Sequence, residues 1–72
     1  MVNVDKLRGK IVQCRMTIEE LARAVGVDRA TLYRRISSGG GSFTIEEADK
    51  IAKVLSLSAD ELNKIFFAQY VT

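Results

Sequence analysis

Three capping boxes constrain this 72-residue chain more than any other feature. In each of them a Ser or Thr precedes a Glu by three positions: Thr17 and Glu20, Thr44 and Glu47, Ser58 and Glu61. The hydroxyl accepts the backbone N–H of the glutamate, and the carboxylate accepts the N–H of the hydroxyl residue, so a helix begins directly after the cap. No proline interrupts the segments that follow. We therefore expect an all-α chain with helices beginning near residues 18, 45 and 59.

Apolar residues recur at helical spacing on both sides of the first capping box. Before it stand Val4, Leu7, Ile11 and Cys14. Their spacing predicts a first helix over about residues 4–14, with Asn3 as its N-cap and Cys14 in the core as a small hydrophobic residue. After the box stand Ile18, Leu21, Ala22 and Val25. They predict a second helix, which Gly26 ends because glycine adopts the left-handed conformation without steric cost.

The remaining helices follow from the same two signals. Leu32 and Ile36 predict a third helix over about residues 29–36, with Asp28 as its N-cap, before a glycine-rich loop over residues 37–42. The apolar face expected for the fourth helix is Ile45, Ala48, Ile51, Ala52 and Leu55. The face expected for the fifth helix is Leu62, Ile65 and Phe66. Residues 1–72 are thus expected to form a single five-helix domain.

Composition excludes several classes of protein. The single cysteine allows no internal disulfide, and in the absence of histidine it cannot form a zinc site, so no metal or cofactor is expected. Charged residues interrupt the first fifteen positions, unlike a signal peptide, and no apolar run approaches the roughly 20 residues of a membrane span. An unpaired thiol fits a reducing compartment. We expect a cytoplasmic protein without a membrane segment.

Charge is distributed unevenly along the chain. Residues 1–43 hold eight basic and four acidic side chains, a net charge of +4, and residues 44–72 hold three and five, a net charge of −2. The first part of the chain therefore suits an anionic partner such as nucleic acid better than the second.

The second and third helices are separated only by residues 26–28, with the sequence GVD. A turn this short that contains glycine joins two helices at a steep angle, and the second helix can project from the body. Ala22 is expected where these two helices cross, because a larger side chain would push them apart. The exposed face of the third helix can then enter a DNA major groove, which is wide enough for one helix.

The segment LARAVGVDRATL over residues 21–32 resembles the helix-turn-helix of the lambda-repressor-like and Cro-like DNA-binding domains, with Leu-Ala, Gly and the apolar positions in register. The resemblance covers about residues 5–66. It implies a five-helix domain that binds double-stranded DNA and represses transcription by occupying an operator. The third helix and the IFF sequence at residues 65–67 are similar to those of short phage and prophage regulators, which implies a bacterial host cell.

Two positions depart from the family pattern. Arg35 stands where many members have an apolar residue three positions after Leu32, so we expect a slightly rotated helix with Ile36 on the core. Ile18 stands where many phage repressors carry a glutamine that contacts phosphate. That contact has to come from another residue or be missing.

A helical wheel orders the candidate DNA contacts. With Leu32 and Ile36 on the core, Ala30 and Arg34 point away from it and Thr31 and Tyr33 lie on the flanks. An arginine can donate to guanine O6 and N7, an alanine can contact a thymine methyl group, and a tyrosine can contact base or phosphate.

Other candidates lie around this face. Arg29, in the first turn of the third helix, is expected to enter the groove first, and Arg35 is expected either on phosphate or in a surface salt bridge. Arg15 and Thr17 beside the second helix, and Ser37 and Ser38 after the third, are candidate phosphate contacts. A plain linker is the alternative for the serine-glycine segment.

The chain lacks the residues that an enzyme of this size would need. It has no histidine, no spaced metal ligands and no Lys-Ser or Lys-Thr after Gly39–Gly41 that would complete a P-loop. The alternative to a DNA-binding regulator is a protein-interaction module, such as an antirepressor or scaffold, that keeps the fold and does not bind DNA. Such a module would require exposed apolar residues on the third helix.

The C-terminal segment suggests a second copy as a partner. Phe67 falls about 100° from Phe66 on the wheel of the fifth helix, so both rings cannot point into one small core. We expect a homodimer, formed in solution or only on DNA, with Phe67, Tyr70 and Val71 in its interface and residues 67–72 as its tail. A tail folded back over the core is the alternative.

Overall fold

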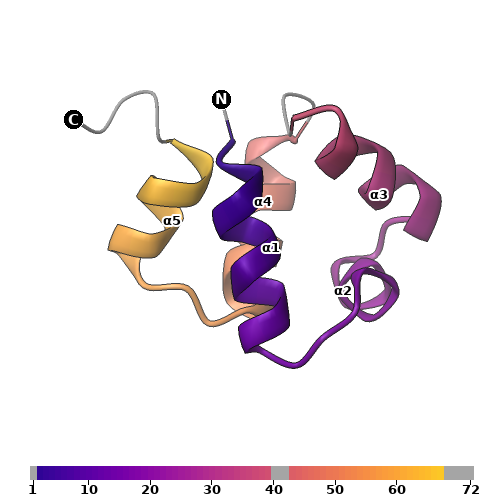
Figure 1. The fold of residues 1–72 in the computed structure, drawn as a ribbon, viewed down its shortest axis with the longest axis horizontal. Coiled ribbons are helices and arrows are strands. Elements are labelled where there is room, and N and C mark those ends of the chain that lie inside the picture. Colours follow the sequence, from indigo (N-terminus) through magenta and orange to yellow (C-terminus); the bar gives the residue numbers. More distant parts are fainter. Residues whose placement is uncertain (1, 40–42, 68–72) are drawn as a thin grey trace.

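The protein is described by a computed structural model over residues 2–39 and 43–67, and this part of the chain is all-α (Figure 1). The helices are α1 (Val4–Gln13), α2 (Ile18–Val25), α3 (Arg29–Ser37), α4 (Ile45–Val54) and α5 (Ala59–Phe66). The five helices expected from the sequence are confirmed, although α1 ends one residue earlier and α3 extends one residue into the expected loop. Within the described residues, no helix has the length and apolar character needed to cross a bilayer.

All three capping boxes form. Glu20, Glu47 and Glu61 donate their backbone N–H groups to Thr17, Thr44 and Ser58 at 3.0–3.1 Å, and their carboxylates accept the N–H groups of the same three residues at 2.9 Å. Asn3 also caps α1, because its side chain accepts the N–H of Lys6 at 3.1 Å. These bonds satisfy donors that the first turn of a helix otherwise leaves without partners.

The cap expected from Asp28 is only half correct. Asp28 occupies the N-cap position of α3, but its side chain makes no capping hydrogen bond. The third residue of α3 is Thr31 rather than a glutamate, so no carboxylate bonds back to the cap and the motif is not reciprocal. Asp28 is exposed and lines a hollow on the protein surface.

Three of the helix junctions share one construction. A residue with positive φ lies just after each preceding helix: Arg15 (57°), Gly26 (86°) and Ser56 (53°). The next residue in each junction is apolar, packs against the core, and donates its N–H to a carbonyl five residues back at 2.9–3.1 Å. The third residue is the N-cap of the following helix. Each junction therefore ends one helix by a Schellman-type hydrogen bond and begins another within three residues.

The core contains residues from all five helices. Its largest fully buried side chains are Leu7, Leu21, Leu32, Ile36, Ile51 and Leu55. Ile65 and Phe66 of α5 close it, and Phe43 meets Phe66 edge to face with ring centroids 5.8 Å apart. Cys14 packs against this cluster from a half-buried position, with its thiol 3.6 Å from the Leu55 carbonyl oxygen.

One expected core residue lies outside it. Ile45 fits the apolar period of α4, yet its side chain is 80% exposed. Helical periodicity fixes the angle of a side chain around the axis, but it does not determine whether a neighbouring element covers that end of the helix. Ile45 is the first residue of α4 and borders a shallow hollow together with Phe43 and Phe67.

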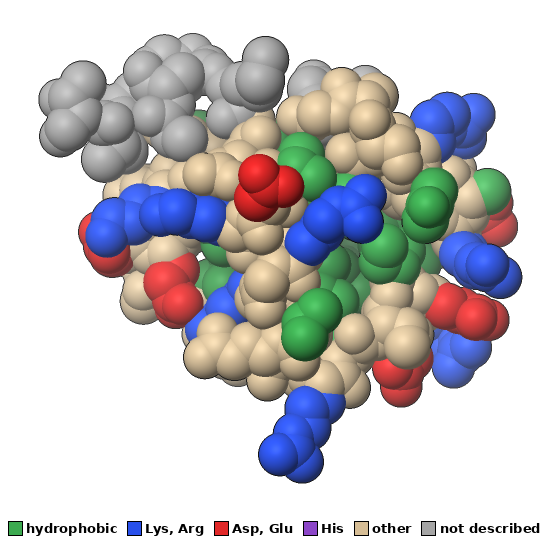
Figure 2. All heavy atoms as spheres, viewed as in Figure 1, with side chains coloured by type: hydrophobic (Ala, Val, Ile, Leu, Met, Phe, Trp, Pro, Cys, Tyr) green, Lys and Arg blue, Asp and Glu red, His purple; other side chains and the backbone are tan. Residues whose placement is uncertain are grey.

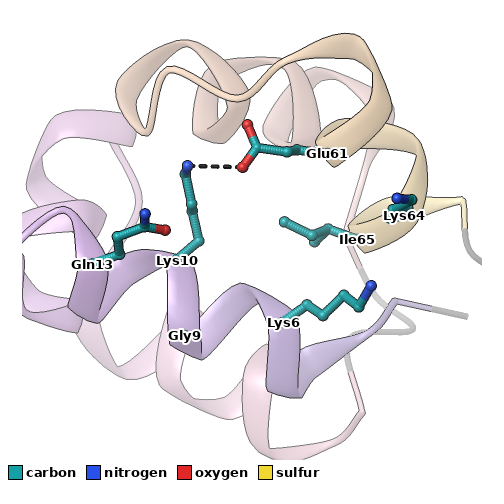
Figure 3. A pocket seen from close by; sticks show the side chains of 7 residues that line it. All are labelled: Lys6, Gly9, Lys10, Gln13, Glu61, Lys64 and Ile65. Carbon is teal, nitrogen blue, oxygen red and sulfur yellow. Dashed lines mark hydrogen bonds and ion pairs between the residues drawn. The ribbon is translucent and has the colours of Figure 1, made fainter.

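The first and last described helices lie against each other. α1 packs on α5, and the Asn3 N–H donates to the Ile65 carbonyl at 2.6 Å. A hollow of about 270 Å³ between them is bridged by an ion pair of 2.8 Å between Lys10 and Glu61 (Figure 3). The hydrogen bond from Lys10 and the bond from the Ser58 backbone lower the pKa of Glu61 to about 2.

Replacing Ala22 by leucine should damage folding. Ala22 is buried in α2, which packs against both α3 and α4, so a larger side chain has to displace one of them. We expect Ala22→Leu to lower the free energy of unfolding by about 1–3 kcal/mol in denaturant titrations. Ala24→Leu is the matched control, because Ala24 is exposed on the same helix and should tolerate the change. Equal stability of Ala22→Leu and the parent chain would contradict the packing of α2.

Stability should fall in acid partly through Glu61. Its folded-state pKa of about 2 lies below the ordinary value of 4.5, so its stabilising contribution is complete above pH 4.5 and is lost as the pH falls from there toward 2. Glu61→Gln should flatten the dependence of unfolding free energy on pH in that window. Lys10→Met should flatten the same window, since it removes the partner. Curves parallel to that of the parent chain would show that the pair does not affect titration.

Candidate DNA-binding surface

The outer face of α3 is polar and accessible because its inner face is buried. Leu32 and Ile36 are each only 1% exposed, and α2 packs against α3 from one side. The opposite face presents Ala30 and Arg34, and Tyr33 on the flank is 55% exposed. The placement expected from the helical wheel is thus observed. The helix lies at one edge of the molecule, on the side away from α5 (Figure 1).

Four of the expected DNA contacts line one shallow surface hollow. Arg29, Ala30, Tyr33 and Arg34 surround it at the N-terminal half of α3, together with Asp28. Two guanidinium groups, a phenol, a methyl group and a carboxylate therefore share one surface. Such a set offers hydrogen-bond donors for guanine, an acceptor for cytosine N4, and an apolar contact for the thymine methyl group.

Thr31 lies at the flank of this face and contacts Arg34. Its hydroxyl is 3.4 Å from a guanidinium nitrogen of Arg34, which donates to it. The residues are three apart, so they are neighbours on the helix surface. Thr31 can therefore hold the Arg34 side chain along the helix.

Arg35 is directed away from this surface. Of the two uses expected for it, the structure shows the salt bridge, in which its guanidinium group pairs with the Glu47 carboxylate of α4. The two side chains are only 25% and 15% exposed. Glu47 also accepts the Thr44 N–H within its capping box, so its two oxygens bond to two different elements.

The remaining phosphate candidates lie outside the hollow. Arg15 is exposed in the junction between α1 and α2, and the Thr17 hydroxyl is occupied as the acceptor of the α2 capping box. Ser37 is the last residue of α3 and Ser38 is its C-cap. The Ser38 hydroxyl donates to the Arg35 carbonyl at 3.1 Å.

The expected dimer residues are only partly described. Phe67 is half-buried, packs against the core, and donates its N–H to the Asn63 carbonyl at 3.0 Å. Tyr70 and Val71 lie outside the described residues. Part of the Phe67 side chain is thus buried by the core of the same chain, without a second copy.

The charge around α2 and α3 is mixed. Figure 2 shows Lys and Arg side chains alternating with Asp and Glu side chains at the edge of the molecule where these helices lie. The acidic side chains of the two helices and their junction are Glu19, Glu20 and Asp28. A surface of this kind attracts the phosphate backbone less strongly than a continuous basic patch would.

Sequence reasoning missed two acidic features of this surface. It assigned Glu47 to a capping turn alone, and its partner Arg35 lies twelve residues away on another helix, so no local pattern could reveal the pair. It also assigned Asp28 to capping, whereas its side chain makes no capping hydrogen bond and the residue lines the hollow. The absence of Glu at position 31 was the available sign that this cap is not reciprocal.

Comparison with known proteins agrees with this geometry. A family model described as helix-turn-helix matches residues 7–62, which run from α1 into α5 and include the whole α2–α3 unit. No curated protein and no solved structure matches the chain. The match covers more than half of the sequence. The chain therefore belongs to the lambda-repressor-like helix-turn-helix family of DNA-binding transcription regulators.

Proposed function

We propose that this protein binds double-stranded DNA sequence-specifically, with α3 in the major groove, and represses transcription by occupying an operator. The observation that carries the proposal is the outer face of α3, where Arg29, Ala30, Tyr33 and Arg34 converge on one exposed surface while the inner face is buried. A rigid helix that presents such side chains can read base edges, because its core contacts fix which residues face the groove.

The same face argues against a protein-interaction module. Docking of a protein partner on α3 would be favoured by contiguous exposed apolar side chains, and this face presents arginines, a threonine and a tyrosine instead. The resemblance of the third helix and of residues 65–67 to short phage and prophage regulators supports a repressor of that origin, acting in the bacterial cytoplasm. Selection of bound sequences from a random duplex pool tests the proposal, since an enriched motif is expected only if the protein reads bases.

We further propose that two copies bind together on DNA. A single domain with two arginines on one hollow makes few contacts, and helix-turn-helix proteins gain affinity by binding two half-sites about one helical turn apart. An enriched sequence with two-fold symmetry would support this arrangement.

Arg34→Ala should weaken binding to the selected sequence by about 1–3 kcal/mol and relax the preference at one base position, because a bidentate contact to a base would be lost. Lys53→Ala removes the same charge from an exposed position on α4 and should leave that preference unchanged. If Arg34 contacts only phosphate, affinity should fall equally on all sequences and depend less on salt. If Arg34→Ala changes neither the affinity nor the base preference, Arg34 is not part of the interface.

Truncation after Phe67 should separate the two functions proposed for the C-terminal residues. This variant retains the ring that packs against the core and lacks Tyr70 and Val71. We expect an unchanged melting temperature in dilute solution and a lower affinity for the symmetric selected duplex, with one copy rather than two bound in sedimentation experiments. A large drop in melting temperature of a protein that remains monomeric on DNA would show that these residues serve the core.

A further inference from the structure

Arg35 and Glu47 form the one ion pair that joins α3 to another helix within the described residues. Four of the other pairs there lie within single helices at i,i+4 spacing, with both side chains more than half exposed. The Lys10–Glu61 pair joins α1 to α5, on the other side of the molecule (Figure 1). Exposed pairs within a helix contribute little and re-form easily, whereas a largely buried pair is held more firmly.

The Glu47 carboxylate is fixed from two sides. One oxygen accepts the Thr44 N–H at 2.9 Å, and the other pairs with the Arg35 guanidinium. The carboxylate cannot follow Arg35 toward solvent without breaking the hydrogen bond that it accepts from the Thr44 N–H. In the paired state the Glu47 side chain is only 15% exposed, and if Arg35 left, this carboxylate would lose its cationic partner. Such separation is unfavourable because a buried charge needs compensation.

The pair therefore determines how many cations α3 offers to DNA. The helix carries three arginines, of which Arg29 and Arg34 line the exposed hollow and Arg35 is held on α4. Arginine remains protonated whatever its surroundings, so a released Arg35 would seek another anion. On bound DNA the nearest anions are backbone phosphates, which carry no sequence information.

We propose that Glu47 is a positioning residue for DNA recognition, because it holds Arg35 on α4 and so keeps this guanidinium off the phosphate backbone. The inference rests on the proposed function of α3 in DNA binding. With Arg35 held, a larger part of the binding free energy comes from contacts that depend on base sequence. Without Glu47, all sequences would gain one phosphate contact alike, and discrimination would fall.

Glu47→Gln tests this directly. Glutamine can still accept the Thr44 N–H, as in natural capping boxes, but it no longer attracts the guanidinium. For a random-sequence duplex, we expect tighter binding at low salt and a slope of log Kobs against log salt that is steeper by about 0.9, the value for one additional phosphate. Between about 50 and 200 mM salt this corresponds to an additional loss of about 3.5-fold in affinity. The ratio of affinities for the selected and random duplexes should fall.

Three further variants isolate the pair. Glu46→Gln makes the same change in net charge in the same turn of α4, at a side chain that is 79% exposed. Its slope of log Kobs against log salt should equal that of the parent protein. Arg35→Gln should also keep the parent slope, because Arg35 makes no phosphate contact there. In the double variant Arg35→Gln with Glu47→Gln, the slope should return to the parent value. Thermal melting of each variant reports its folded state.

Each outcome decides between specific alternatives. A parent protein that binds no duplex DNA refutes the proposed function and this inference together. If the parent binds and Glu47→Gln keeps its slope, or loses affinity on both duplexes together with melting temperature, Glu47 is purely structural and only the inference fails. An equal steepening in Glu46→Gln would show a general effect of charge and would also overturn it.

Discussion

Glu47 and Glu61 each bond to the start of their own helix and to a basic side chain of another helix. One carboxylate oxygen accepts the N–H of the N-cap, and the other pairs with Arg35 of α3 or Lys10 of α1. The apolar contacts of the core are non-directional, whereas each of these hydrogen-bonded pairs fixes the relative direction of two side chains. These two shared carboxylates add directional contacts between α3 and α4 and between α1 and α5.

The orientation of α3 follows from this arrangement. Leu32 and Ile36 attach one face of the helix to the core, and the Arg35–Glu47 pair holds its flank against α4. Arg29 and Arg34 remain exposed and line the surface hollow. Acidic and basic side chains are interspersed at this edge of the molecule (Figure 2), so the electrostatic attraction of this surface for a phosphate backbone is moderate. A surface of this composition favours contacts that differ between base sequences over contacts that all sequences offer.

The sequence predicted the helices well because their starts are encoded locally. A capping box contains both partners within four residues, and its hydrogen bonds form as expected at Thr17, Thr44 and Ser58. Ile45 could not be placed in the same way, since helical period does not tell which end of α4 its neighbours cover. The Arg35–Glu47 and Lys10–Glu61 pairs join residues 12 and 51 positions apart. Such ion pairs depend on how the helices pack against one another, and no local sequence pattern predicts that packing.

The three helix junctions of similar construction differ in one respect, which affects the free energy of unfolding of this small chain. Gly26 adopts its positive φ without a side chain, whereas Arg15 and Ser56 adopt the same left-handed region with a Cβ atom. That conformation costs L-residues about 1–2 kcal/mol. The junction that orients α3 is therefore the relaxed one, and the strain lies in the junctions before α2 and α5. Evolution or design can relieve it at Ser56, well separated in sequence from α3, and so offset the cost of substitutions on the outer face of that helix.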